Sequence, residues 1–222
     1  MEDDGKVDPA EEALETAPVA PSRGQKMDEG LRWFSDFVFR PFTWFFGKLG
    51  VSPNVITMFG LALAIASGYL LSVGSVPLAA VLFTLSGILD IVDGYVAKKL
   101  DRITVFGSFL DSFSDRLSDA AIYLGLVVYY LKRTEGIYVG LALVVLVVSF
   151  LISYVRARAE SLDVHCKAGL MARAPRVILL MVGLFFNGLS PWVLRVVLWV
   201  LAVLLVETLV ERLIEVWRAL ER

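Results

Sequence analysis

The sequence has very few soft metal ligands: it contains one histidine, His165, and one cysteine, Cys166. A single cysteine excludes a disulfide within the chain, and two adjacent soft ligands are too few for a zinc site. Basic residues are not in excess either, with 21 Lys and Arg against 23 Asp and Glu, so no nucleic-acid partner is predicted. We interpret His165 and Cys166 as loop residues.

Charged residues are missing from three long stretches of the chain, residues 49–89, 136–155 and 177–194. A helix needs roughly 20 apolar residues to span the hydrocarbon core, so the first stretch alone can cross a membrane twice. The chain is 57% hydrophobic with a mean hydropathy of +0.71, which is more apolar than a soluble domain of this length. The sequence therefore predicts an integral membrane protein.

The N-terminal part lacks the short basic start of a secretory signal peptide, so the first transmembrane helix is expected to stay in the membrane. Residues 1–26 are acidic, rich in Ala and Pro and without apolar periodicity, which predicts a disordered tail. Residues 27–50 interleave Phe and Trp with charged residues. This pattern predicts an amphipathic helix in the headgroup layer, with a docking surface for a partner as the alternative.

Turn residues divide residues 51–222 into six predicted transmembrane helices, which gives an all-α membrane bundle. The first helix is expected over about 54–73, and the second begins after the turn at 74–77 and ends near 99. The other four are expected over about 105–131, 136–159, 174–186, and from 191 to beyond 207. Most Lys and Arg then fall on one side of the bilayer, together with both termini. The positive-inside rule makes this side cytoplasmic, in a multi-pass protein of the cell membrane.

Four aspartates fall near the cytoplasmic ends of the second and third predicted helices. Asp90 and Asp93 are spaced i, i+3, and Asp111 and Asp115 are spaced i, i+4, so each pair lies on one helix face. The short loop between the helices makes them antiparallel neighbours. We therefore expect all four carboxylates to converge.

Four carboxylates cannot all stay ionised together at low dielectric, but divalent cations would neutralise them. Hard oxygen ligands favour Mg²⁺ or Mn²⁺, and two such ions could bridge a diphosphate while one carboxylate accepts a proton from an attacking hydroxyl. Gly94, Ala97 and Gly107 accompany the aspartates and lack bulk, which leaves room for a phosphate group between the helices.

Two alternatives compete with this interpretation of the acids. Intramembrane acids can form structural ion pairs, and for Asp119 with Arg116, at i, i+3, pairing is the favoured explanation. They can also line the cation pathway of a transporter. For the four aligned aspartates, structural ion pairing is a weak explanation, because their negative charge exceeds the positive charge of the nearby bases. It would also leave the accompanying Gly94, Ala97 and Gly107 unexplained.

The pattern D-(x)2-D-G-(x)2-A-K-(x)8-G-(x)3-D-(x)3-D, from Asp90 to Asp115, resembles the signature of the CDP-alcohol phosphotransferases, membrane enzymes of phospholipid synthesis. The one departure is Lys98, where the family usually has Arg. The resemblance implies that the four aspartates bind two metal ions and that Asp115 is also the general base. It further implies that a CDP-lipid is contacted by Gly94, Ala97, Lys98, Asn54, Thr57 and Gly107.

The acceptor must be inferred from a second region. The stretches SYVRARAESLDV, from Ser153, and GLMARAPRV, from Gly169, are similar to those of phosphatidylinositol phosphate synthases and their archaeal relatives. This implies transfer to inositol phosphate with release of CMP. The implied phosphate ligands are Arg156, Arg173 and Arg176. For Arg158, phosphate binding and a location that merely follows the positive-inside rule are equally favoured.

Several questions stay open at the level of sequence. Ala172 stands where the motif usually has an acid, so glycerol phosphate or serine are alternative acceptors. The lipid can be diacylglycerol or archaeol, because lipid tails contact generic apolar surface. The family resemblance favours a homodimer. A row of small residues, Gly60, Ala64 and Gly68, could serve either a dimer interface or internal helix packing.

Overall fold

The computed structural model describes residues 51–164 and 171–221. The predictions for residues 1–26 and 27–50, and for His165 and Cys166, lie outside these residues. The described part is all-helical, as predicted, and contains no strand. Its six helices are α3 (Pro53–Ser72), α4 (Val76–Lys99), α5 (Val105–Leu131), α6 (Gly136–Glu160), α7 (Arg173–Phe186) and α8 (Pro191–Leu220).

The helix ends follow local sequence signals. Proline lies in the first turn of α3, α4 and α8, where its missing N–H costs no hydrogen bond. The turn between α3 and α4 contains Gly74 with a φ of +90°, a conformation that suits glycine. The Thr104 side chain accepts a hydrogen bond from the Gly107 N–H and so caps α5. These signals explain why the predicted ends lie within a residue of the observed ones, apart from α8, which extends to Leu220.

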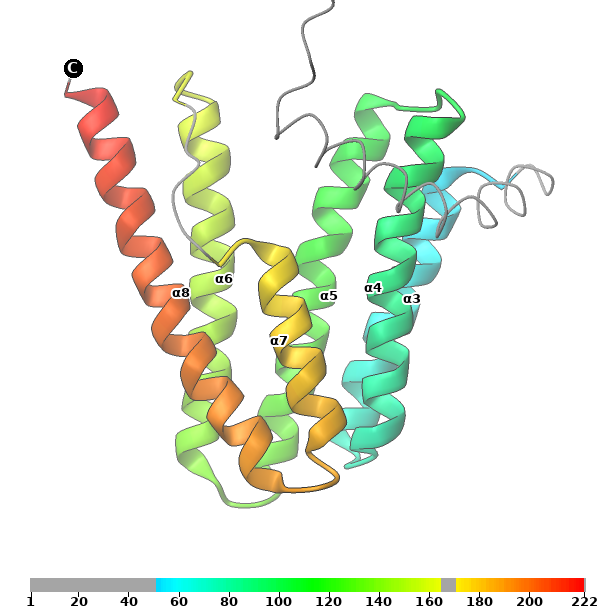
Figure 1. Cartoon of the computed structure of the whole chain (residues 1–222), viewed down its shortest axis with the longest axis vertical. Helices are drawn as coiled ribbons and strands as arrows, with labels where there is room; N and C mark the ends of the chain where they lie inside the picture. Colours follow the sequence, from blue (N-terminus) through cyan, green and yellow to red (C-terminus); the bar gives the residue numbers. More distant parts are fainter. Residues whose placement is uncertain (1–50, 165–170, 222) are drawn as a thin grey trace, which may run out of the picture.

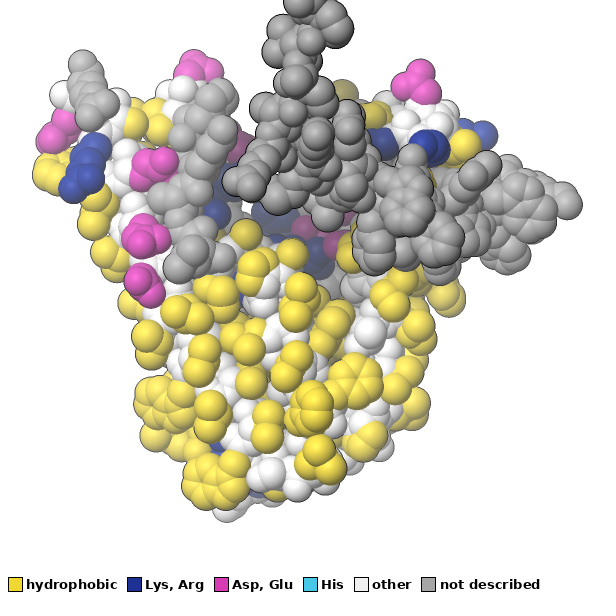
Figure 2. Space-filling model, in the orientation of Figure 1, with side chains coloured by type: hydrophobic (Ala, Val, Ile, Leu, Met, Phe, Trp, Pro, Cys, Tyr) yellow, Lys and Arg dark blue, Asp and Glu magenta, His cyan; other side chains and the backbone are white. Residues whose placement is uncertain are grey.

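Four helices, α3, α4, α6 and α8, have the length and apolar composition to cross a membrane. In Figure 2 the surface of the bundle is hydrophobic over most of its height, and acidic and basic side chains gather at the upper end. The chain is therefore a multi-pass membrane protein. The six-span count stays a prediction, because α5 carries charges in its first half and α7, with 14 residues, rises only about 21 Å.

The first three helices form one tightly packed unit, in which α3 contacts both α4 and α5. A Cβ at Gly68 would lie 2.2 Å from the Ala121 carbonyl oxygen, and one at Gly125 would lie 2.3 Å from the Gly68 carbonyl oxygen. The backbones of α3 and α5 thus touch where they cross. Gly60, Ala64 and Gly68 are all buried in α3, so the small-residue row serves internal packing.

The remaining helices build the other side of the bundle. Helix α6 packs on α5 and α8, and α7 packs on α8 and α4. Figure 1 shows α5 and α6 diverging toward the end at which α4 and α5 are joined. The main hydrophobic core includes residues of all six described helices, and a small separate cluster of Ile56, Val92 and Val96 further joins α3 to α4. Most of the charged groups lie at the end where the helices diverge.

Candidate active site

The six residues predicted to contact a CDP-lipid line one cavity of about 190 Å³, which is formed by the first turn of α3, the end of α4 and the start of α5. These residues are Asn54, Thr57, Gly94, Ala97, Lys98 and Gly107. The structure thus brings together residues from three helices. Their roles as ligands are still predictions.

Two glycines shape this first cavity, which we call the donor cavity. A Cβ at Gly94 would meet nothing within 4 Å, so any side chain there would project into open space. A Cβ at Gly107 would lie 2.8 Å from Thr104 Oγ1 and 3.1 Å from Asn54 Oδ1. The absence of side chains therefore keeps the cavity open at Gly94 and allows α5 to approach α3 at Gly107.

Three of the four predicted metal ligands form a cluster. Asp90, Asp111 and Asp115 each offer a carboxylate oxygen, and these oxygens lie within 4.8 Å of one another. Asp93 is buried at 4% exposure, lines the donor cavity and accepts a hydrogen bond from Thr57. An oxygen-only donor set suits Mg²⁺ or Mn²⁺. The cluster therefore fits the predicted metal type, and participation of Asp93 stays a prediction.

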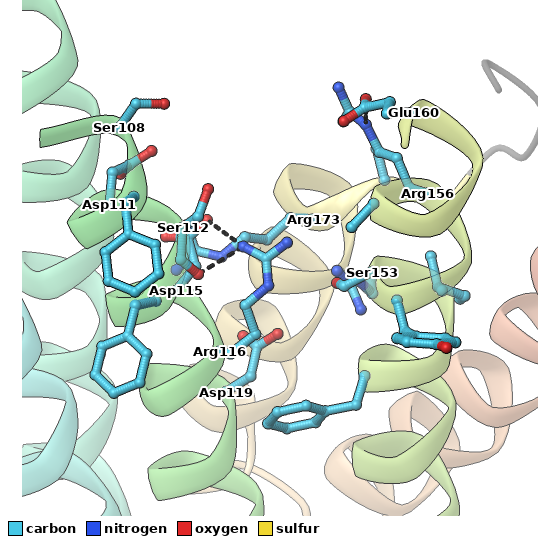
Figure 3. A pocket seen from close by; sticks show the side chains of 18 of the residues that line it. Ser108, Asp111, Ser112, Asp115, Arg116, Asp119, Ser153, Arg156, Glu160 and Arg173 are labelled. Carbon is cyan, nitrogen blue, oxygen red and sulfur yellow. Dashed lines mark hydrogen bonds and ion pairs between the residues drawn. The ribbon is translucent and has the colours of Figure 1, made fainter. Parts of the chain in front are cut away.

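Arg173, the first residue of α7, connects the acidic cluster to a second cavity. Its Nη1 lies 2.7 Å from Asp90 Oδ2 and 2.7 Å from Asp115 Oδ1. Figure 3 shows Arg173 together with Asp115 in this cavity. The sequence predicted this arginine on the acceptor phosphate. That role stays a prediction: Arg173 lines the second cavity, and in this structure it is also the counter-charge of one carboxylate on α4 and one on α5.

The second cavity has a volume of about 750 Å³ and lies among α5, α6, α7 and α8. We call it the acceptor cavity. All three arginines assigned to the acceptor, Arg156, Arg173 and Arg176, line it. Arg158 is not among the described residues that line it, and its Nη1 lies 3.4 Å from Ser161 Oγ. This position favours the positive-inside explanation for Arg158.

The arginines of the acceptor cavity differ in their partners. Arg156 lies at the exposed rim, where its Nε donates to Glu160 at 2.9 Å. Arg176 is only 5% exposed, and its Nε and Nη1 find no hydrogen-bond partner among the described residues. Buried guanidinium nitrogens without a hydrogen-bond partner are costly. Arg176 is therefore the arginine with the most to gain from an anionic ligand.

The sequence interpretation missed two residues of this cavity. Arg212 on α8 is buried, donates from Nη1 to the Ile152 carbonyl oxygen at 3.1 Å and lines the cavity. The positive-inside rule had accounted for it as a C-terminal base. Asp119 also lines the cavity, although it was expected to pair with Arg116. That expectation was wrong, because Arg116 extends back along α5, donating to the Ser112 carbonyl oxygen at 2.6 Å.

The donor and acceptor cavities meet along α5. Ser108 and Asp111 line both of them. Molecules in the two cavities would therefore face each other across the acidic cluster. Carboxylates that can hold divalent cations, next to arginines that can hold phosphate, suit phosphoryl transfer. The class of protein is thus a membrane-embedded phosphotransferase.

Comparison with known proteins gives the particular family. Residues 50–210 match the model of the CDP-alcohol phosphatidyltransferase family, and the chain belongs to this family. It is therefore a transferase of phospholipid biosynthesis, and the cation-transporter alternative is set aside.

Two relatives and one solved structure illustrate the similarity. The chain is 38% identical to an archaetidylinositol phosphate synthase of Methanothermobacter thermautotrophicus, over 78% of this chain and 87% of the relative. It is 33% identical to a phosphatidylinositol phosphate synthase of Mycolicibacterium smegmatis, over 74% and 77%. A crystal structure of the Mycobacterium tuberculosis phosphatidylinositol phosphate synthase with CDP-DAG bound has a TM-score of 0.75 and 30% identity, covering 81% of this chain and 94% of that one.

A second structure of the Mycobacterium tuberculosis enzyme, in complex with manganese and citrate, has a TM-score of 0.74 and 31% identity. It covers 80% of this chain and 88% of that one. A structural relative thus binds a divalent metal of the kind that the oxygen-only cluster of Asp90, Asp111 and Asp115 favours.

Proposed function

We propose that the chain transfers a phosphatidyl-type group from a CDP-lipid, CDP-diacylglycerol or CDP-archaeol, to a hydroxyl of inositol phosphate and releases CMP. The observation that carries this proposal is the shared wall of the two cavities at Asp111 and Ser108. It lets a nucleotide-linked donor and a phosphorylated acceptor meet at the acidic cluster. The names of the relatives support inositol phosphate over glycerol phosphate or serine.

The donor cavity provides groups for the CDP moiety. The N-termini of α3 and α5 both line it, and helix N-termini favour phosphate through their free N–H groups and dipoles. Lys98 adds a positive charge at the end of α4. Asn54 and Thr57 offer hydrogen-bonding side chains, and the open space at Gly94 admits the ligand close to the backbone.

The reaction forms a bond between the acceptor oxygen and the lipid-side phosphorus and breaks the bond from that phosphorus to the CMP oxygen, which leaves with the electron pair. Asp115 lines the acceptor cavity and would take the proton from the attacking hydroxyl. Asp90, Asp93, Asp111 and Asp115 would hold two Mg²⁺ or Mn²⁺ ions. When bound, these ions supply charge neutralisation for the diphosphate and the leaving group.

The acceptor cavity provides the counter-charge for a phosphorylated alcohol. Arg176 and Arg212 are buried within it, and Arg156 lies at its rim. Guanidinium groups bind phosphate through paired N–H donors. We therefore assign the acceptor phosphate to Arg156, Arg173 and Arg176, and add Arg212 from the structure.

An acceptor screen tests this proposal. The purified full-length protein is incubated with CDP-diacylglycerol or CDP-archaeol, Mg²⁺ and one acceptor at a time, and CMP release is followed. We expect CMP with inositol phosphate and none after removal of divalent cations with a chelator. CMP with glycerol phosphate or serine but not inositol phosphate would refute the acceptor. Absence of CMP with every acceptor would refute the reaction.

The proposal includes the arrangement in the membrane. It has a tail over residues 1–26, an interfacial helix over 27–50 and a six-span domain over 51–222. The protein acts as a homodimer, with the active site and both termini on the cytoplasmic side.

Cys166, the single cysteine, permits a direct test of this orientation. A membrane-impermeant maleimide should label Cys166 in inside-out vesicles and leave right-side-out vesicles unlabelled, with Cys166→Ser as the control. Labelling of right-side-out vesicles alone would reverse the orientation.

A further inference from the structure

Two acidic residues that line the acceptor cavity are not used by the mechanism above: Glu160, which accepts a hydrogen bond from Arg156 at the rim, and Asp119. Asp119 follows Asp115 by one turn on α5, and both line the cavity. Figure 3 shows the aspartates in order down this face of α5, with Asp119 lowest in the view. Asp119 is thus placed deeper in the bundle than the cluster that would hold the reacting groups.

The position of Asp119 is unexpected for a pocket that binds a phosphate. Its charge interacts with those of Arg176 and Arg173, yet no ion pair among the described residues includes it. A lone carboxylate would repel an acceptor phosphate placed next to it. A carboxylate is, however, a strong hydrogen-bond acceptor for hydroxyl groups.

The spacing along α5 relates the two carboxylates to one acceptor molecule. Residues spaced i, i+4 have Cβ atoms about 5–6 Å apart. Two hydroxyls of one cyclic polyol are separated by a similar distance across the ring. A ring whose reacting hydroxyl lies at Asp115 can therefore present a second hydroxyl to Asp119, and the cavity of about 750 Å³ has room for it.

We propose that Asp119 selects the acceptor by accepting a hydrogen bond from a hydroxyl that does not react, so that the site prefers a phosphorylated cyclic polyol to a phosphorylated alcohol with a single hydroxyl. Arg176 and Arg212 then bind the phosphate, and Asp119 binds the ring. This inference rests on the proposed function, because it concerns the acceptor of the same reaction. It gives Asp119 a role in the choice of acceptor rather than in the chemical step.

Two kinds of change test the inference on the full-length enzyme with CDP-lipid and Mg²⁺. Asp119→Ala removes the hydrogen-bond acceptor, and we expect the KM for inositol phosphate to rise about tenfold to a hundredfold with kcat changed much less. Asp119→Asn keeps one carbonyl oxygen and should give a smaller rise. The matched control is Asp163→Asn, in the exposed turn after α6, which should leave KM unchanged.

Monodeoxy analogues of inositol phosphate complete the experiment. In the wild-type enzyme, one analogue that keeps the reacting hydroxyl should show the same rise in KM as Asp119→Ala does with inositol phosphate. With Asp119→Ala, that analogue should show no further rise, because both changes remove the same contact. Fully additive effects with every analogue would instead mean that Asp119 and these hydroxyls do not interact, and would overturn the inference.

The outcomes separate this inference from the proposed function. If wild-type enzyme releases no CMP with inositol phosphate, the proposed function fails. If it does, but neither Asp119→Ala nor any monodeoxy analogue raises KM, only the role of Asp119 fails. Should Asp119→Ala not fold, the Asp119→Asn variant and the wild-type analogue series still decide the question.

Discussion

The two ends of the helix bundle both carry charged residues, but their partners differ. At the end away from the cavities, Arg195 donates to both oxygens of Glu135, at 3.0 and 2.6 Å. Its guanidinium also lies 5.0 Å from the Trp192 ring centre and 5.4 Å from that of Tyr138. At the cavity end, Arg176 has two buried nitrogens with no hydrogen-bond partner among the described residues.

This difference distinguishes a structural ion pair from a binding site. The Glu135–Arg195 pair joins the start of α6 to the start of α8, and its bidentate geometry satisfies both groups. Unsatisfied buried polar groups are rare in folded proteins and need a compensating role. At the cavity end the unsatisfied donors line a cavity, so a ligand can complete their hydrogen bonds.

The largest expected effect is at the cavity end. Asp115→Asn keeps the shape of the side chain and removes its capacity to accept a proton, so kcat should fall about 10²-fold to 10⁴-fold. Binding of CDP-lipid, measured by equilibrium titration of the detergent-solubilised protein, should stay within a few-fold of wild type, since the donor cavity is unchanged. Retention of normal turnover would remove Asp115 from the mechanism.

A smaller effect is expected for Arg176→Ala. The variant loses charged hydrogen-bond donors, so the KM for the acceptor should rise about tenfold to a hundredfold while kcat changes less. Arg158→Ala is the matched control, because Arg158 lies near the same membrane surface but outside the residues that line the cavity. Equal rises in KM for the two variants would show a general effect of surface charge rather than a binding contact.

The smallest effect on activity is expected at the opposite end. Glu135→Gln weakens the pair with Arg195, so thermal unfolding should occur at a lower temperature, while both KM values stay at wild-type levels. Differential scanning fluorimetry and the CMP assay measure the two quantities on the same sample. A raised acceptor KM in this variant would mean that the two ends are coupled, and the structural interpretation of the pair would fail.

Much of the fold followed from local signals in the sequence. Uncharged stretches, prolines and glycines located all six helices, because these features act within a few residues of the positions they affect. The aspartate spacing placed Asp90, Asp111 and Asp115 on facing sides of α4 and α5, since helical periodicity fixes the direction of each side chain. The family signature then identified the chemistry, which the family match confirmed at the level of the enzyme class.

The sequence by itself thus determined the helices, the acidic cluster and the family. Only the tertiary structure decided that Arg173 bridges Asp90 and Asp115, that Arg212 enters the acceptor cavity, and that Asp119 lines it without its predicted partner. The physical reason is distance along the chain. Helix periodicity relates residues a few positions apart, whereas contacts among α4, α5, α7 and α8 depend on how the helices cross. Close approaches such as that of Gly68 and Gly125 set those crossings.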